Sequence, residues 1–406
     1  MYIFKAAVVG AGTMGGGLAQ VVSFSGLPVV LKDVDPKMLD KGMDAIRRIY
    51  QSRVDKGKMS AGKMESKLAL VEPTLTYDGF GDVDIVIEAV PERMAVKRSV
   101  LQELDEALPE TAIIASNTSA LSISEMGAAT KRPHKVVGMH FFNPAHVMKL
   151  VEVIPGLETS QETIDDVVMF AESLRKIPVV VQECPGFLVN RLLMPYLNEA
   201  TYCLQEGAAT ASDIDAAVVA FGMPMGPFTL MDMLGIDVCR HVGDYLYEEY
   251  GPRMTPASLF YKLVDAGRLG EKTGKGFYGY GGETDEPVKE MIAAFSREPQ
   301  PYGSEFSIER AIYPLINEAV LCVTERIASV NDIDMAMIAG TGMTYGGERK
   351  GPLAIADQIG LDAVLDKLNA LHAQYGERFR PARLLRTKVR AGHLGVQTRR
   401  GFHEYA

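Results

Sequence analysis

The chain has 406 residues, of which 47% are hydrophobic and 23% are charged. A chain of this length exceeds one ordinary hydrophobic core, so it indicates two or three folded domains. The net charge of −10 argues against a nucleic-acid or anionic-membrane partner, since both need a basic surface.

The four cysteines are widely spaced, with no CxxC pair and no histidine at zinc-ligand spacing. This pattern predicts buried thiols in a reducing compartment and no metal site. The N-terminus enters a predicted strand without the leader of a secretory signal, and no apolar run reaches membrane-spanning length. The expected location is the cytoplasm.

A glycine-rich loop, Gly10–Gly15, follows a strand predicted over residues 4–9 and precedes a predicted helix. Gly10 allows a tight turn, Gly12 lets the backbone approach a pyrophosphate, and Gly15 lets the helix pack against the sheet. The N–H groups at the helix start then face the phosphates. This order of parts predicts a dinucleotide site.

Asp33 lies 23 positions after Gly10, at the end of the next apolar run. A carboxylate at about this spacing accepts hydrogen bonds from the ribose hydroxyls of the dinucleotide. It also repels a 2′-phosphate, so the sequence predicts NAD rather than NADP as the cofactor.

Short apolar runs alternate with amphipathic stretches over residues 1–183, which is typical of a doubly wound α/β sheet. We therefore predict a Rossmann-like domain there. The polar stretch 38–70 predicts helices that project from the sheet, and nine basic against four acidic residues lie within 37–67. The predicted strands are 4–9, 29–31, 85–89, 112–115, 136–139, 150–154 and 178–181.

His140 ends an apolar run and precedes two aromatic residues and a proline. A shielded imidazole is suited to accept a proton from an alcohol. Glu152 interrupts another apolar run, where a carboxylate is costly without a partner. If the chain reverses near His146, His140 and Glu152 lie opposite one another, and Glu152 orients the imidazole. The alternatives are a hydrogen-bonded core histidine, or His134 or His146 as the base.

The segment Ser116–Ser119 follows the predicted strand 112–115. Its polar side chains are expected at the carboxyl edge of the sheet, where doubly wound folds bind their ligands. Capping of the next helix by serine or threonine is the alternative interpretation.

Beyond residue 185 helical periodicity replaces the strand signals, and the sequence repeats itself. Residues 191–200 recur as 310–319, and the offset then grows from 119 to 125 because the second copy has six more residues. We predict two tandem all-α domains related by this repeat and joined by a linker over 279–303. The predicted domains are 1–183 (NAD-binding), 184–285 (first helical, with substrate and active-site residues) and 303–406 (second helical, a degenerate structural repeat).

Seven motifs in order resemble those of the L-3-hydroxyacyl-CoA dehydrogenases of fatty-acid β-oxidation. Together they span most of residues 4–280, and the tandem repeat resembles the dehydrogenase part of the large multifunctional β-oxidation enzymes. The resemblance implies NAD-dependent oxidation of L-3-hydroxyacyl-CoA to 3-ketoacyl-CoA. The motifs are Gly10–Gly15, Glu88–Glu92, Ser116–Ser119, His140–Pro144, Lys149–Glu152, Pro185–Arg191 and Lys272–Phe277.

The same resemblance implies roles for individual residues. His140 is implied as the general base with Glu152 orienting it, and a further pair, Ser119 and Asn190, as the groups that bind the substrate oxygens. Lys56 aligns with a lysine that contacts coenzyme A, in agreement with the basic excess around it. The residues implied to line the cofactor site are Gly10, Gly12, Met14, Gly15, Asp33, Glu92, Lys97, Asn143 and Lys272.

The second helical copy departs from this pattern, since Glu309 stands in the place of Asn190 and Gln397 in the place of Lys272. We expect this copy to be structural and to pack on the first as a dimer partner would, giving either a monomer with an internal pseudo-dimer or a homodimer. The sequence has no hydratase or thiolase segment, so those activities are expected in separate proteins.

Two other functions stay open at this stage. One is a dehydrogenase of a small free hydroxy acid on the same fold, for which the basic stretch 37–67 would be irrelevant. The other is a non-catalytic NAD-binding structural or regulatory protein. The presence of Ser119, His140, Glu152 and Asn190 together argues against the second.

Overall fold

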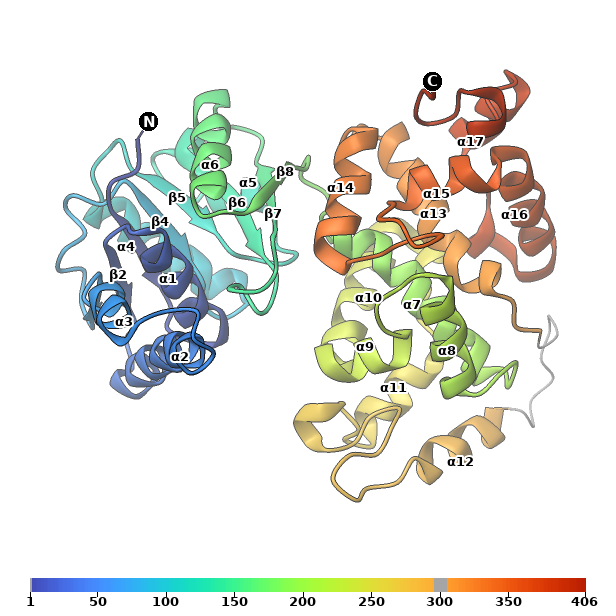
Figure 1. Ribbon diagram of the computed structural model, residues 1–406, viewed down its shortest axis with the longest axis horizontal. Helices are drawn as coiled ribbons and strands as arrows, with labels where there is room; N and C mark the ends of the chain where they lie inside the picture. Colours follow the sequence, from blue (N-terminus) through green and yellow to red (C-terminus); the bar gives the residue numbers. More distant parts are fainter. Residues whose placement is uncertain (1, 296–304) are drawn as a thin grey trace. The chain divides into compact units, whose positions relative to one another are not determined.

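The computed structural model describes residues 2–295 and 305–406. The chain forms two compact units, Met1–Phe187 and Leu188–Ala406. The first unit is a sheet flanked by helices and the second is helical (Figure 1), which confirms the predicted fold class.

An eight-stranded sheet with the order β3-β2-β1-β4-β5-β6-β7-β8 forms the centre of the first unit. All neighbouring strands are parallel except β6 and β7, which are antiparallel. The strands are β1 (Ala6–Val9), β2 (Val29–Lys32), β3 (Val71–Thr74), β4 (Ile85–Glu88), β5 (Ile113–Ser116), β6 (Val136–Phe141), β7 (Leu150–Pro155) and β8 (Ile177–Val180).

Strands β1, β2, β4 and β5 are buried along their whole length, as expected for parallel strands covered on both faces. Strand β3 is absent from the predicted set. It lies at the edge of the sheet, where its exposed Glu72 and Pro73 interrupt the apolar pattern that marks the other strands. A proline is tolerated in such an edge strand because one side of the strand needs no ladder hydrogen bond.

The polar stretch 38–70 is helical, as predicted, and forms most of α2 and α3. Helix α2 starts with Pro36 after the N-cap Asp35, whose side chain accepts a hydrogen bond from the Lys37 N–H. The helices of the first unit are α1 (Thr13–Ser25), α2 (Pro36–Asp55), α3 (Ala61–Leu68), α4 (Met94–Ala107), α5 (Ile123–Gly127), the 3₁₀ turn η1 (Pro133–Lys135) and α6 (Gln161–Ser173).

The second unit contains the two helical copies. Its elements are α7 (Val189–Gln205), α8 (Ala211–Phe221), α9 (Pro227–Leu234), α10 (Ile236–Tyr250), η2 (Gly251–Met254), α11 (Ser258–Asp265), η3 (Glu271–Thr273), α12 (Glu286–Phe295), α13 (Ile308–Thr324), α14 (Val330–Thr341), α15 (Pro352–Ile359), α16 (Leu361–Tyr375), η4 (Gly376–Phe379), α17 (Arg383–Arg390) and η5 (Val396–Thr398). Helices α16 and α17 of the second copy correspond to α10 and α11 of the first. The predicted linker 279–303 is not wholly a loop, because α12 lies within it and buries Val288 and Phe295; residues 296–304 lie outside the described part.

Helices α7 and α13, which are equivalent in the two copies, pack against each other through reciprocal ion pairs. Arg191 Nε lies 2.8 Å from Glu318 Oε1, and Arg310 Nε lies 2.8 Å from Glu199 Oε1. Both arginines are buried, and each pair joins one copy to the other. The contact therefore has the self-complementary pattern of an isologous dimer interface within one chain, as the sequence analysis expected.

We expect Glu199→Ala to lower the free energy of unfolding of the helical unit by about 3 to 5 kcal/mol, because it leaves buried Arg310 with one acidic partner fewer. Urea titration followed by far-UV circular dichroism measures the change. Glu309→Ala is the control, since the Glu309–Lys367 pair is more than one-third exposed and its loss is expected to cost about 1 kcal/mol or less. Equal effects of the two substitutions would contradict this account.

Candidate functional site

The three glycines of the loop between β1 and α1 differ in the space available for a side chain. Gly12 has open space in front of it, whereas Gly10 and Gly15 have none. Gly10 has φ +98°, and a Cβ there would lie 2.6 Å from the Ala89 carbonyl oxygen. A Cβ on Gly15 would lie 1.7 Å from the Gly10 carbonyl oxygen. A Cβ on Gly12 would meet only the Met38 methyl group, at 3.9 Å. The space before Gly12 therefore fits a pyrophosphate, while Gly10 and Gly15 shape the loop itself.

The start of α1 and Asp33 complete this cradle. The first turn of α1 has no acidic residue, and no side chain in the described part of the chain caps it, so its N–H groups suit an anion. Asp33 follows β2 and is half-buried. Its carboxylate accepts hydrogen bonds from the Ala11 N–H at 2.7 Å and the Asp35 N–H at 3.0 Å. These bonds hold the carboxylate beside the loop, where a ribose of a bound dinucleotide would need it.

His140 and Glu152 face each other across β6 and β7. The antiparallel register pairs the two residues directly, and His140 Nδ1 lies 2.6 Å from Glu152 Oε2. His140 is 7% exposed and Glu152 is fully buried. The rings of Phe142 and Phe187 lie 4.5 and 5.9 Å from the imidazole ring. The expected pairing across adjacent strands is confirmed.

This geometry decides which nitrogen can act. Because Nδ1 is engaged by Glu152, Nε2 is the nitrogen of His140 that can accept a proton from a ligand. A buried carboxylate bound to the other ring nitrogen is the arrangement expected around a histidine that acts as a general base. That role stays a prediction for His140.

The rival histidines lack such a partner. No ion pair of His134 or His146 with an acid is found among residues 2–295 and 305–406, and the His134 side chain is exposed on η1. Partial burial lowers the pKa of His146, and the positive charges of Lys176 and Arg53 lower that pKa further. Both effects disfavour a protonated His146, so the described residues give His146 neither an acidic partner nor a raised pKa.

Ser119 lies beside the carboxylate of Glu92 at the carboxyl edge of the sheet. Glu92 Oε1 accepts hydrogen bonds from the Thr118 hydroxyl at 2.6 Å and the Ser119 N–H at 2.8 Å. Burial raises the pKa of Glu92, but the charge of Lys97 and these hydrogen bonds more than offset it, so the pKa is lowered overall. Glu92 therefore stays ionised and orders the segment 116–119.

Lys97 is fully buried beneath this segment. Its ammonium lies 2.8 Å from Glu88 Oε1 and 3.3 Å from Glu92 Oε2, and the Ser116 hydroxyl donates to Glu88 at 2.5 Å. Lys97 thus positions two carboxylates, and its direct contact with a cofactor stays a prediction. The sequence analysis gave no role to Glu88 or Thr118, although Glu88, like Glu152, is an acid in a buried apolar strand.

The other predicted residues are spread over both units. Asn143 is exposed after β6, and Lys56 is exposed at the end of α2. Met14 is partly buried against the core of the first unit. Asn190 begins α7, and Lys272 lies in η3, where its ammonium pairs with Asp237. The roles predicted for these residues are not tested by their positions.

Other kinds of site find no support in the described part of the chain. No group of histidine, cysteine and acidic residues there could hold a metal ion, and none of the helices there is long and apolar enough to cross a membrane. The four cysteines are buried, as predicted, and none forms a disulfide within the described residues. A dinucleotide cradle and a buried His–Glu pair within one α/β unit are the parts of a nicotinamide-dependent dehydrogenase.

Comparison with known proteins identifies the family. The family model for the 3-hydroxyacyl-CoA dehydrogenase NAD-binding domain matches residues 5–184, and the model for the C-terminal domain of the same family matches residues 186–280 and 306–405. The chain belongs to the 3-hydroxyacyl-CoA dehydrogenase family. This confirms the resemblance seen in the motifs and the prediction of NAD as the cofactor.

Among curated relatives, a fatty acid oxidation complex subunit alpha from Psychrobacter arcticus is 40% identical over 98% of this chain and 56% of its own length. The chain spans about half the length of the curated relatives it matches. Among solved structures, 3-hydroxybutyryl-CoA dehydrogenase from Escherichia coli K12 is 30% identical with a TM-score of 0.85, covering 96% of this chain and 99% of its own. (S)-3-hydroxybutyryl-CoA dehydrogenase PaaH1 from Ralstonia eutropha is 41% identical with a TM-score of 0.67, covering 69% of this chain and 99% of its own.

Two glycine substitutions separate the binding role of the loop from its folding role. We expect Gly12→Ala to leave the free energy of unfolding within about 0.5 kcal/mol of wild type, because its methyl group meets open space. NAD affinity should fall by about tenfold or more, since the methyl group occupies the approach of the pyrophosphate. Isothermal titration calorimetry and thermal unfolding measure the two effects.

Gly15→Ala is the matched comparison, because its methyl group overlaps the Gly10 carbonyl oxygen and should destabilise the fold itself. Full NAD affinity in Gly12→Ala would contradict the assignment of the cradle.

Proposed function

We propose that this chain catalyses the NAD-dependent oxidation of L-3-hydroxyacyl-CoA to 3-ketoacyl-CoA, a reversible reaction. The observation that carries the proposal is the buried His140–Glu152 pair in the same unit as the dinucleotide cradle. The Escherichia coli and Ralstonia eutropha structures, named for 3-hydroxybutyryl-CoA, support this substrate class.

His140 is the general base of the proposed reaction. The glycine loop and Asp33 would hold NAD, which would supply the hydride acceptor for C3 of the substrate. Nε2 of His140 accepts the proton of the 3-hydroxyl group while Glu152 holds Nδ1 and stabilises the imidazolium. In the reverse direction the imidazolium of His140 returns this proton to the carbonyl oxygen.

Other residues bind and orient the reactants. Ser119 and Asn190 hydrogen-bond the substrate oxygens, and Asn143 lies near the nicotinamide. Gly10, Gly12 and the start of α1 hold the pyrophosphate. These roles follow from the family resemblance, and the contact between Glu92 and Ser119 supports an ordered position for Ser119.

The coenzyme A part of the substrate is proposed to meet α2. A surface hollow of about 520 Å³ on this helix is lined by four basic residues and two aspartates, which suits phosphate groups. Lys56 at the end of the same helix would add a further positive charge. The lining residues are Lys37, Asp40, Lys41, Asp44, Arg47 and Arg48.

We place the reaction in fatty-acid β-oxidation or a related branch of acyl-CoA metabolism, in the cytoplasm. The relatives named as subunits of a fatty acid oxidation complex support this placement. Hydratase and thiolase activities are proposed to come from partner proteins. The buried cysteines, which form no disulfide within the described residues, are consistent with a reducing compartment.

We expect His140→Ala to lower turnover by about 10² or more while NAD affinity is retained, because proton transfer is lost and the cradle is not. NADH oxidation with acetoacetyl-CoA and longer 3-ketoacyl-CoA substrates measures this. Glu152→Gln should lower turnover as well, since it keeps the shape of the side chain and removes the charge that stabilises the imidazolium.

His134→Ala is the control and should have wild-type activity. Unchanged turnover in His140→Ala would place the base elsewhere. Equal activity on free acetoacetate and on acetoacetyl-CoA would instead favour a dehydrogenase of small free acids, and NAD binding without turnover on any substrate would favour a non-catalytic role.

Replacing Asp33 with asparagine is expected to relax the discrimination against NADP, because the carboxylate that repels the 2′-phosphate is removed. The ratio of kcat/KM for NADH and NADPH should fall by about tenfold or more if this repulsion contributes at least 1.4 kcal/mol. Asp35→Asn, a neighbouring exposed carboxylate at the cap of α2, is the control. An unchanged ratio in Asp33→Asn would contradict the ribose assignment.

A further inference from the structure

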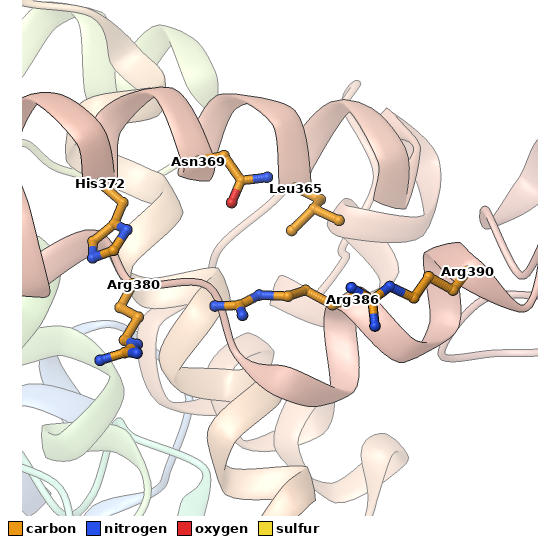
Figure 2. Close-up of a pocket in the computed structure, with 6 residues that line it drawn as sticks. All are labelled: Leu365, Asn369, His372, Arg380, Arg386 and Arg390. Carbon is orange, nitrogen blue, oxygen red and sulfur yellow. The ribbon is translucent and has the colours of Figure 1, made fainter.

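The second helical copy contains a basic pocket that no predicted function uses. It has a volume of about 400 Å³ and lies between α16 and the segment formed by η4 and α17. Figure 2 shows Leu365 and Asn369 of α16 pointing toward the guanidinium groups of Arg386 and Arg390, with His372 and Arg380 at one end. These six residues line the pocket.

Acidic partners neutralise only one end of this pocket. Glu377 lies 3.1 Å from Arg380 and 3.4 Å from His372. Across the described ranges, neither Arg386 nor Arg390 takes part in an ion pair with an acidic residue. Two guanidinium groups that share a pocket without a carboxylate between them repel each other, and an anion between them would remove that repulsion.

Arg386 has a donor that the protein leaves unused. One terminal nitrogen of its guanidinium donates to the Pro381 carbonyl at 2.8 Å, whereas its Nε is buried without a hydrogen-bond partner. A buried donor without an acceptor is costly, so such groups usually mark a ligand, a water or strain. One donor of the Arg386 guanidinium, its Nε, therefore lacks an acceptor within the described residues.

In the first helical copy, the equivalent groove between α10 and α11 is closed by its own side chains. There Asp244 of α10 lies 3.5 Å from Arg240 and accepts a hydrogen bond from the Tyr261 hydroxyl of α11. The Arg240 guanidinium also stacks on the Tyr261 ring at 4.8 Å. Every polar group of this cluster thus has a partner within the copy.

The second copy replaces the members of that cluster by residues that cannot close it. At the offset of 125 positions, Leu365 stands for Arg240, Asn369 for Asp244 and Arg386 for Tyr261. In addition, Arg380 stands for Thr255 and Arg390 for Asp265. At these five positions the first copy has one arginine and two aspartates, whereas the second copy has three arginines and no carboxylate. Because the same helix pair folds without these arginines in the first copy, helix packing does not explain them.

We propose that this pocket binds a small molecule carrying a diphosphate or two neighbouring phosphate groups. Guanidinium forks match phosphate oxygens in a bidentate manner, and here they approach from α17 and from the end of η4. The Asn369 amide and the His372 ring supply further donors from α16. Arg380 is already paired with Glu377, and a single carboxylate would neutralise only one of the other two arginines, whereas a diphosphate carries enough charge for both. This site is independent of the proposed dehydrogenase function.

The test uses the full chain saturated with NAD, so that the dinucleotide cradle is occupied, and inorganic pyrophosphate as the probe. Isothermal titration calorimetry at low salt should show pyrophosphate binding that weakens as salt is added. The double variant Arg386→Gln/Arg390→Gln should bind about tenfold more weakly or worse, because two charge-assisted contacts are lost. Arg383→Gln removes one positive charge from the same helix outside the pocket and should change the affinity less than about twofold.

A second variant restores a feature of the first copy without removing an arginine. Asn369→Asp should also weaken pyrophosphate binding, since its carboxylate competes for the guanidinium groups. The unfolding temperature of each variant, compared with wild type, shows whether the fold is intact. Dehydrogenase turnover should be unchanged in all of them.

Three outcomes would overturn the proposal. The first is an absence of binding to the wild-type chain at millimolar pyrophosphate. The second is unchanged affinity in the folded double variant, which would place the binding at another basic surface. The third is citrate binding as tightly as pyrophosphate, which would mean that the pocket does not select phosphate.

Discussion

The hydrogen bond between His140 and Glu152 is the interaction on which the rest of the proposed chemistry depends. A fully buried carboxylate is expensive without a partner, and a general base needs a defined tautomer; one contact of 2.6 Å meets both needs. The contact exists because β7 runs antiparallel to β6 in an otherwise parallel sheet, which places two residues twelve positions apart directly opposite each other. Backbone topology thus sets the geometry of the base, and the aromatic neighbours shield it.

A second group of charges, centred on buried Lys97, orders the neighbouring part of the same sheet edge. Lys97 holds Glu88 and Glu92 together, and Glu92 in turn binds the segment that carries Ser119. Glu88 could not be buried alone at acceptable cost, and the buried lysine pairs with both carboxylates. The network orders the segment after β5 at the carboxyl edge of the sheet, where ligands of doubly wound sheets bind.

The two copies in the second unit keep the ion pairs of their shared interior but differ in sequence at the surface. The reciprocal pairs Arg191–Glu318 and Arg310–Glu199 keep the two copies together, while positions away from α7 and α13 have diverged. The groove between α10 and α11 is closed by its own side chains, and the equivalent groove between α16 and α17 is open and basic. A copy that has lost the residues implied in catalysis can therefore acquire a different ligand.

Local signals in the sequence were enough to predict the fold class, the glycine loop and the helical repeat. They also predicted the position of Asp33 after β2 and the pairing of His140 with Glu152. Each of these features is marked by a short pattern of residues. Patterns that depend on a distant partner were missed. Strand β3 has no apolar alternation of its own and exists because β2 offers it an edge, and α12 lies where composition indicated a linker. The roles of Asn190 and Lys272, which lie in the second unit, stay predictions.

By itself, then, the sequence determined the class of fold and the candidate base, since apolar periodicity and an acid in a buried strand are written in neighbouring residues. Only the tertiary structure decided which buried charges pair, why Gly12 and Gly15 differ in the space around them, and that three arginines spread over eleven positions converge on one pocket. These properties depend on distances between atoms in the folded chain, and composition and spacing do not encode such distances.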